Sequence, residues 1–259
     1  MRLSVITIGI DPEIQLGPVT IAWHGLTIAI GILIGGLLAG RYLRERRLDP
    51  DPLYSIGALA AVGGIVGGRV LYVLEHGGPL FGTRGFSFDG GFILAAALIV
   101  GYVWRQGLGA RYLDAGAAGL ALGVAVGRVG DIINGEHYGP QSDFLLAVRN
   151  SHPDALTPSP DLAFHNGGLY EVMLASLIFA IVWPLRHRLR PGALTWLVVA
   201  LFSAGRFVEF FARSDSPELA LGLNNAQWTS LAMFVVALVG WWLTIGRPSR
   251  RAATERAGP

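Results

Sequence analysis

The chain of 259 residues contains no cysteine and no lysine, and only 15% of its residues are charged. Without cysteine the protein itself has no disulfide, no thiolate metal site and no cysteine nucleophile. Every basic residue is an arginine and the arginines form no basic face, so the net charge of +2 predicts no nucleic-acid partner. A soluble domain carries about a quarter charged residues. The low charge, with 52% hydrophobic residues and 36 glycines, indicates a polytopic membrane protein.

Several catalytic and metal-binding patterns are also missing. There is no HExxH motif and no paired histidine spacing, so we expect no metal and no cofactor. There is no G-x-S-x-G segment, which disfavours an intramembrane serine protease. Residues 1–18 contain acids and a proline before the first apolar run, unlike a cleavable signal peptide. The first apolar run would then act as the insertion signal.

Apolar runs long enough to cross a membrane fill most of the chain. A membrane-spanning helix needs about 20 mostly apolar residues. We predict seven such helices, at roughly 19–40, 54–74, 90–104, 113–134, 168–185, 192–212 and 226–245. The predicted fold class is therefore all-α. The predicted division is an N-terminal segment at 1–18, a transmembrane domain at 19–245 with a long loop at 135–167, and a basic tail at 246–259.

The arginines between the predicted helices are distributed unequally. Four arginines (Arg2, Arg84, Arg149 and Arg213) lie on one side of the predicted membrane. Thirteen lie on the other side, in the segments 41–53, 105–112 and 186–191 and in the tail. The positive-inside rule places the arginine-rich side in the cytoplasm. We therefore predict an outer N-terminus, a cytoplasmic C-terminus and an extracytoplasmic cap at 135–167.

The three remaining arginines, Arg69, Arg128 and Arg206, lie inside apolar runs. A charge within hydrocarbon is costly unless it is paired or wetted, so it marks a candidate functional site. Each arginine falls in the outer half of its predicted helix, at the depth where the inward-running helices begin. Polar residues at those beginnings are His24, Asp89, His165, Tyr170 and Glu171. We predict an outward-opening polar cavity whose arginines bind a phospholipid headgroup, because guanidinium matches phosphate oxygens.

Two short spacings support a plainer alternative. Arg128 and Asp131 are three residues apart, and so are Arg206 and Glu209, so each pair shares a helix face. Each pair taken alone could be a local ion pair that neutralises buried charge. Three arginines at one depth are more than such packing requires.

Glycines recur every fourth residue in the predicted helices. Gly119, Gly123 and Gly127 follow this spacing in one run, and Gly31 and Gly35 follow it in another. Small residues at this spacing let helices approach closely. We therefore predict a tightly packed helical bundle.

The segment at 127–139, GRVGDIINGEHYG, resembles the signature of the bacterial prolipoprotein diacylglyceryl transferase family, G-R-x-G-N-F-x-N-x-E-x-x-G. Five further segments resemble motifs of that family in the same order. They are WHGLTIAIG, GGRVLYVL, FSFDGGFI, HNGGLYE and GRFVEFFAR. The resemblance covers about residues 18 to 243, which is nearly the whole chain.

The resemblance implies an enzyme of the bacterial inner membrane that uses phosphatidylglycerol and prolipoprotein signal peptides. The diacylglyceryl group would pass to the lipobox cysteine, giving a thioether and glycerol phosphate. Catalytic roles are implied for Arg128, Arg206, Glu136, Asp89 and Asp131. Substrate-binding roles are implied for Arg69, Asn134, Tyr170, Glu209, His24, His165, Gly90 and Gly91.

The chain departs from the family pattern at five places. The histidine of F-H-G-G, a proposed base, is Asp89, and an aspartate accepts a thiol proton only where desolvation raises its pKa. The signature asparagine is Asp131, and the tyrosine of the first motif is His24, a candidate substitute base. The P-x-Q of the fifth motif is Asn-Gly-Gly at 166–168, and Arg206 lies one residue closer to its glutamate than in the family.

Two alternatives stay open at this point. Asp89 and Asp131 suit a paralogue that has lost catalysis and binds anionic phospholipid. An outward cavity with arginines also suits an anion transporter. The transporter is less favoured because no inverted repeat is evident and transporters place their sites near the midplane of the membrane.

Overall fold

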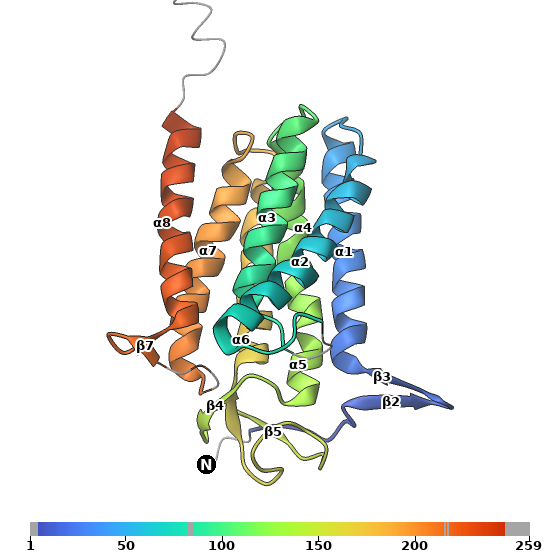
Figure 1. The fold of residues 1–259 in the computed structure, drawn as a ribbon, viewed down its shortest axis with the longest axis vertical. Helices are drawn as coiled ribbons and strands as arrows, with labels where there is room; N and C mark the ends of the chain where they lie inside the picture. The colour runs from blue at the N-terminus through green and yellow to red at the C-terminus, as the bar shows by residue number, and fades with distance from the viewer. Residues whose placement is uncertain (1–4, 82–84, 215, 217, 247–259) are drawn as a thin grey trace, which may run out of the picture.

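The computed structural model describes residues 5–81, 85–214, 216 and 218–246. Long helices run side by side, and small β-structures gather at one end of the bundle (Figure 1). We call this end the sheet end. The helices are α1 (Trp23–Glu45), α2 (Pro52–His76), α3 (Phe88–Arg105), α4 (Arg111–Gly127), α5 (Val129–Asn134), α6 (Gly167–Leu185), α7 (Ala193–Glu209), the 3-10 turn η1 (Phe210–Ala212) and α8 (Asn225–Gly246).

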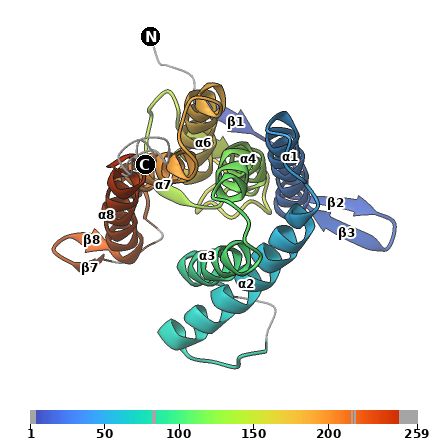
Figure 2. The same ribbon diagram turned by 90° about the horizontal axis from the view of Figure 1, so that it is seen from above.

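Six helical segments among the described residues have the length and hydropathy of a membrane span. They are α1, α2, α4 continued by α5, α6, α7 continued by η1, and α8. The third predicted span corresponds to α3, which has 18 residues and pairs with α2 at one side of the bundle (Figure 2). Six of the seven predicted membrane-spanning helices are thus confirmed in length and hydropathy, and the chain is a multi-pass membrane protein. The crossing of α3 and the orientation of the termini stay predictions.

The expectation of an all-α fold is wrong at the sheet end. The strands are β1 (Ile6–Ile8), β2 (Glu13–Leu16), β3 (Val19–Ala22), β4 (Tyr138–Gln141), β5 (Val148–Asn150), β6 (Phe164–Asn166), β7 (Glu218–Ala220) and β8 (Leu223–Asn224). A four-stranded sheet has the order β1-β5-β6-β4, with β1 parallel to β5 and the other pairs antiparallel. The pairs β2–β3 and β7–β8 are separate antiparallel ribbons.

The sheet joins two segments that the sequence analysis had separated. Ile6 pairs with Val148, so the N-terminal segment and the long loop at 135–167 form one cap. These strands have only three or four residues, which is too short for an alternating apolar pattern to be recognised. The basic tail predicted after α8 lies outside the described residues.

Local sequence signals fix where several helices begin. The side chain of Asn166 accepts a hydrogen bond from the Leu169 nitrogen at 2.8 Å and caps α6. Asn224 and Gln227 exchange side-chain to backbone hydrogen bonds of 2.9 and 3.0 Å, which is a capping box at the start of α8. Gly192 precedes α7 with φ of 88°, a conformation that glycine adopts without strain.

Glycine contacts between α1 and α4 confirm the predicted close packing. A Cβ atom at Gly119 would overlap the carbonyl oxygen of Gly35, and one at Gly123 would lie 2.8 Å from that of Gly31. The two backbones are therefore too close for any side chain at these positions. Buried apolar residues, including Tyr42, fill the end of the bundle away from the sheets. The sheet end is left for polar groups.

Candidate functional site

Arg128 lies at the break between α4 and α5, where the polar groups of several helices meet. Its Nη1 is 2.5 Å from Asp131 Oδ2, which confirms the predicted local pair. Its Nε contacts Oε2 of Glu171, the fifth residue of α6. Arg128 therefore joins the end of α4 and α5 to the beginning of α6.

Glu171 links two arginines from different helices. Its side chain is fully buried, with 0% of its surface exposed. Oε1 accepts a hydrogen bond from Nη1 of Arg206 in α7, while Oε2 faces Arg128. The sequence predicted that Glu171 lies at the polar depth, but it assigned this residue no role. The structure brings Arg128 and Arg206 together through this one carboxylate.

A third arginine completes the group, and it is Arg213 rather than Arg69. Nη1 of Arg213 is 3.4 Å from Oε1 of Glu209, and both side chains are buried. Arg213 and Arg206 both lie over the ring of Phe210, at 4.3 and 4.8 Å from its centroid. We call Arg128, Arg206 and Arg213, with the carboxylates of Asp131, Glu171 and Glu209, the arginine cluster.

His137 connects two members of the arginine cluster. Its Nδ1 lies 2.7 Å from Nη2 of Arg213, and its Nε2 lies 3.2 Å from Nη1 of Arg128 and 3.6 Å from Oδ2 of Asp131. A guanidinium only donates, and a neutral imidazole accepts at one nitrogen. The neutral ring therefore accepts from only one of Arg213 and Arg128, and its other nitrogen carries the proton.

His24 approaches the arginine cluster from the first turn of α1. Its Nδ1 is 2.6 Å from Oδ1 of Asp131 and 3.6 Å from Oε2 of Glu136. Glu136 in turn accepts a 2.9 Å hydrogen bond from Nδ2 of Asn134. Four predicted site residues of the signature and of the first helix thus lie in contact with one another.

The cap holds the signature segment from outside the bundle. Nδ2 of Asn150, in β5, donates to the carbonyl oxygens of Ile132 and Ile133 at 2.8 and 3.1 Å. These carbonyls lie at the end of α5, where a helix leaves acceptors without partners. Gly135 follows with φ of 73°, so the chain turns sharply toward β4. The sheet therefore fixes the position of Asp131 through α5.

Arg69 belongs to a different local structure. Its guanidinium donates to the carbonyl oxygens of Leu80 and Gly85 at 3.0 Å each, and to that of Pro79. All three acceptors lie in the connection between α2 and α3. The prediction that Arg69 shares a site with Arg128 is not supported by these bonds, because they hold the connection against α2.

The predicted site residues of α3 contact the neighbouring helices α2 and α8. A Cβ atom at Gly90 would overlap the carbonyl oxygen of Gly67, and one at Gly91 would lie 2.8 Å from that of Gly64, so both glycines pack α3 against α2. Oδ2 of Asp89 accepts a 3.1 Å hydrogen bond from Thr229 in α8. Asp89 also lies within electrostatic range of Arg206.

The remaining predicted residues, His165 and Tyr170, pair with each other at the start of α6. The hydroxyl of Tyr170 is 2.5 Å from Nδ1 of His165. Two glycines, Gly167 and Gly168, precede Tyr170 in the same segment. A Cβ atom at Gly167 would lie 3.0 Å from Oε1 of Glu209, and one at Gly168 would lie 3.0 Å from Cβ of Asp131. The glycines let α6 begin against the arginine cluster.

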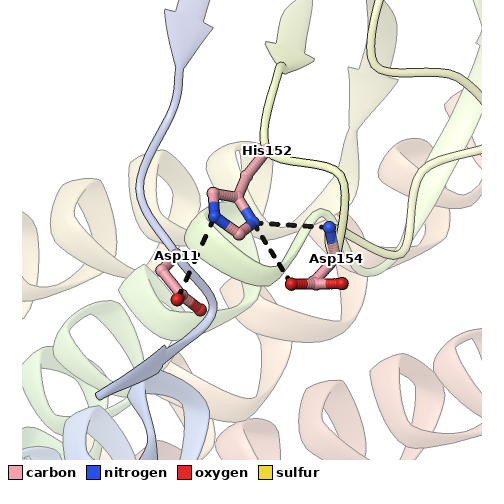
Figure 3. A group of neighbouring side chains, drawn as sticks. All are labelled: Asp11, His152 and Asp154. Carbon is pink, nitrogen blue, oxygen red and sulfur yellow. Dashed lines mark hydrogen bonds and ion pairs between the residues drawn. The ribbon is translucent and has the colours of Figure 1, made fainter. Parts of the chain in front are cut away.

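A cavity of about 450 Å³ opens between the cap and the β2–β3 ribbon. Its lining includes Ala22, two residues before His24, and Asn134. Asp11, at its edge, belongs to a surface group with His152 and Asp154 (Figure 3). His152 Nε2 is 4.0 Å from Asp11 Oδ2, and its Nδ1 is 3.8 Å from Asp154 Oδ2. Both carboxylates are largely exposed, so the group is a loose surface contact between two parts of the cap.

Comparison with known proteins agrees with the motifs at this site. Residues 13–243 match the family described as prolipoprotein diacylglyceryl transferase. The chain belongs to this family. It is therefore a transferase, and the residues of the arginine cluster lie in three of the segments that resemble motifs of the family.

Curated relatives of the family cover nearly the whole chain. A phosphatidylglycerol–prolipoprotein diacylglyceryl transferase of Gloeobacter violaceus is 33% identical over 94% of this chain and 94% of its own length. A relative of the same name from Paenarthrobacter aurescens is 32% identical over 94% of this chain and 84% of its own length. One from Frankia alni is 33% identical over 91% of this chain, but the match spans only 66% of that longer relative.

Proposed function

We propose that this chain transfers the diacylglyceryl group of phosphatidylglycerol to the cysteine thiol of a prolipoprotein. The products would be a thioether-linked lipid and glycerol phosphate. The observation that carries the proposal is the single buried carboxylate of Glu171, which holds Arg128 and Arg206 together at the sheet end. The names of the curated relatives support the same reaction.

The arrangement suits a reaction that releases a phosphate. When sulfur displaces the phosphate oxygen at the glycerol carbon, negative charge grows on the departing group. Guanidinium groups fixed in place before the reaction stabilise that charge without having to reorganise. Arg128 and Arg206 are fixed by Glu171, and Arg213 is fixed by Glu209. We assign phosphate stabilisation to Arg128 and Arg206.

Other cluster residues would position these groups and the lipid. We assign support of the signature segment to Asn134 and Glu136, which bond to each other, and orientation of Arg213 to Glu209. The hydroxyl of Tyr170, held by a histidine at the edge of the cluster, would face the lipid headgroup.

The substrates also fit the proposed orientation. With the sheet end outside the cytoplasm of a bacterial inner membrane, the cluster lies where the prolipoprotein signal peptide emerges. The attacking thiol belongs to the acceptor, in agreement with a chain that has no cysteine. The thiolate is the reactive form, so the site must also remove a proton.

The test is transfer by the purified protein in mixed micelles of phosphatidylglycerol with a lipobox peptide. Mass spectrometry detects diacylglyceryl-cysteine, and a coupled assay detects glycerol phosphate. Arg128→Ala is expected to remove detectable transfer. Arg128→Lys keeps the positive charge but offers no planar fork, so we expect it to fold and to reduce kcat by about 10²–10³.

Arg41→Ala is the matched control, because Arg41 is exposed at the opposite end of α1 and pairs with Glu45 there. It is expected to transfer at the wild-type rate. Folded wild-type protein that binds anionic lipid but never forms the thioether would replace the proposal with the binding-only paralogue. Anion flux in liposomes without thioether would replace it with the transporter. Wild-type transfer by both Arg128 variants would show that this arginine is structural.

A further inference from the structure

His24 is held in one position at the edge of the arginine cluster. It is the second residue of α1, and 37% of its side chain is exposed. The backbone nitrogen of Gly130 donates to Oγ1 of Thr27 at 3.1 Å, which locks α5 against α1. A Cβ atom at Gly130 would lie 2.5 Å from Cα of His24, so no larger residue fits at this contact. The spacing of His24 and Asp131 is therefore set by packing of the backbone.

The contact with Asp131 determines which nitrogen of His24 is available. A carboxylate only accepts hydrogen bonds, so the 2.6 Å contact places the proton on Nδ1. Nε2 of the neutral ring then carries a lone pair and points away from the carboxylate. This is the arrangement in which a carboxylate orients a histidine and stabilises the imidazolium that forms when the histidine takes up a proton.

Among the described residues, the charged groups that act on His24 belong to the segment 128–136. Asp131 lies in α5 and contacts His24 through Oδ1. Glu136 follows α5, and its Oε2 is 3.6 Å from Nδ1 of His24. Arg128 contacts the other carboxylate oxygen of Asp131. Both nearby carboxylates favour a protonated ring, and the arginine opposes it. The cavity at the sheet end is lined by Ala22, two residues before His24, and by Asn134, which bonds to Glu136.

We infer that His24 is the general base that removes the proton from the acceptor thiol, and that Asp131 is its positioning residue. The inference rests on the proposed transferase function. Nε2 of His24 takes the proton from the thiol, and the thiolate attacks the glycerol carbon of the lipid. A carbon–sulfur bond forms, the carbon–oxygen bond to phosphate breaks, and its electron pair leaves with glycerol phosphate. The proton then passes from Nε2 to the phosphate or to water.

Asp89 is less suited to this step. A thiol has an ordinary pKa of about 8.5, an imidazole about 6.5 and an aspartate about 3.9. Proton transfer from the thiol is thus unfavourable by about 10²-fold to an ordinary imidazole and by more than about 10⁴-fold to an ordinary aspartate.

The order of groups also favours His24. A continuous series of contacts runs from His24 through Asp131, Arg128 and Glu171 to Arg206. The series starts at a half-exposed imidazole and ends among buried guanidinium groups. This order separates a place for the thiol from a place for the phosphate. His24 and Asp131, which differ from the family motif at two separate places, are the two residues in direct contact.

The experiment compares His24→Asn with the wild type in the transfer assay, across pH 5 to 9. Asparagine retains a donor close to Nδ1 and so keeps the contact with Asp131, but it has no basic nitrogen. We expect kcat to fall by about 10²–10⁴ with little change in the KM for phosphatidylglycerol. The wild-type rate should rise with pH as the His24 imidazolium loses its proton, and the variant should lack that rise. His24→Gly should recover part of the rate when imidazole is added.

Two further variants separate the roles. Asp89→Asn is expected to keep the rise with pH that His24→Asn loses. Asp131→Asn is expected to shift the rise to lower pH, because the charge that favours the imidazolium is lost. Loss of the rise in Asp89→Asn, or its retention in a folded His24→Asn, overturns the inference and leaves the transferase function intact. Absence of thioether from the wild type overturns the function itself, and the inference with it.

Discussion

Replacing Glu171 by glutamine removes the one negative charge that joins Arg128 to Arg206. The substitution keeps the shape of the side chain, so it tests charge rather than packing. Glu171 has no exposed surface and faces a guanidinium on each oxygen. The variant would therefore leave two buried arginines next to a neutral amide.

The structure sets the size of the expected effect. Removing one partner of a buried ion pair lowers the free energy of unfolding by about 3–5 kcal/mol, because the remaining charge is left without compensation. The amide oxygen of glutamine can still accept one of the two bonds, and Arg128 keeps its contact with Asp131. We therefore expect the lower end of the range, about 3 kcal/mol. For a chain of this length that corresponds to a decrease in melting temperature of about 6–12 °C.

The assay is thermal unfolding in a neutral detergent, followed by tryptophan fluorescence. Glu45→Gln is the matched control, because Glu45 also bonds to arginines, Arg41 and Arg186, but at the partly exposed opposite end of the bundle. A pair of that kind contributes about 0–1 kcal/mol. The melting temperature of Glu45→Gln should therefore lie within about 4 °C of the wild type.

Repeating the measurement with phosphatidylglycerol tests the link to function. A phosphate bound between Arg128 and Arg206 would supply the negative charge that Glu171→Gln lacks. The deficit in melting temperature should then become smaller in phosphatidylglycerol than in neutral detergent. An equal deficit in both would show that the phosphate does not reach these arginines. A melting temperature equal to that of Glu45→Gln would refute the assignment of Glu171 as the charged link.

Two further predictions concern the scaffold. Gly119→Ala should lower the free energy of unfolding by about 1–3 kcal/mol, because its Cβ overlaps the Gly35 carbonyl. Gly116→Ala in the same helix is the control, because a Cβ atom there has no neighbour within 4 Å and should not lower the free energy of unfolding. Equal melting temperatures of the two variants would contradict the packing argument. Asp114→Ala should lower it by about 2–3 kcal/mol with unchanged transfer per folded molecule, because this buried carboxylate accepts three hydrogen bonds from the start of α7. Unfolding and transfer assays on one preparation measure both effects, and a slower rate in the folded Asp114 variant would contradict its purely structural role.

The sequence predicted the parts of the site that depend on short-range spacing. Arg128 and Asp131 are three residues apart, and the helix geometry brings them to 2.5 Å. The fourfold glycine spacing likewise predicted close helix packing, but not which two helices would meet. The period of the helix determines which residues share a face, and a single segment contains that information.

The groups that were missed are joined over long sequence separations. Glu171 meets Arg206 across 35 positions, and Arg213 meets His137 across 76. Arg213 was counted with the outer loop because it follows the last apolar residue of its run, yet it turns back toward Glu209. Arg69 was grouped with the other buried arginines by depth alone. Depth does not determine which side of a helix an arginine occupies, and Arg69 bonds to carbonyls of its own connection.

The balance of charge in the arginine cluster explains how it can exist within an apolar bundle and still bind an anion. Three guanidinium groups contact the carboxylates of Asp131, Glu171 and Glu209, so each buried arginine has an acidic partner before a substrate enters. Pairing with a carboxylate lowers the free-energy cost of burying an arginine, and an isolated buried arginine would bear that cost in full. An entering phosphate then competes with carboxylates for donors that are already oriented. That competition weakens binding of the substrate. The negative charge that develops as the carbon–oxygen bond breaks meets donors that need no rearrangement. The transition state is therefore stabilised more than the bound substrate, and this difference accelerates the reaction.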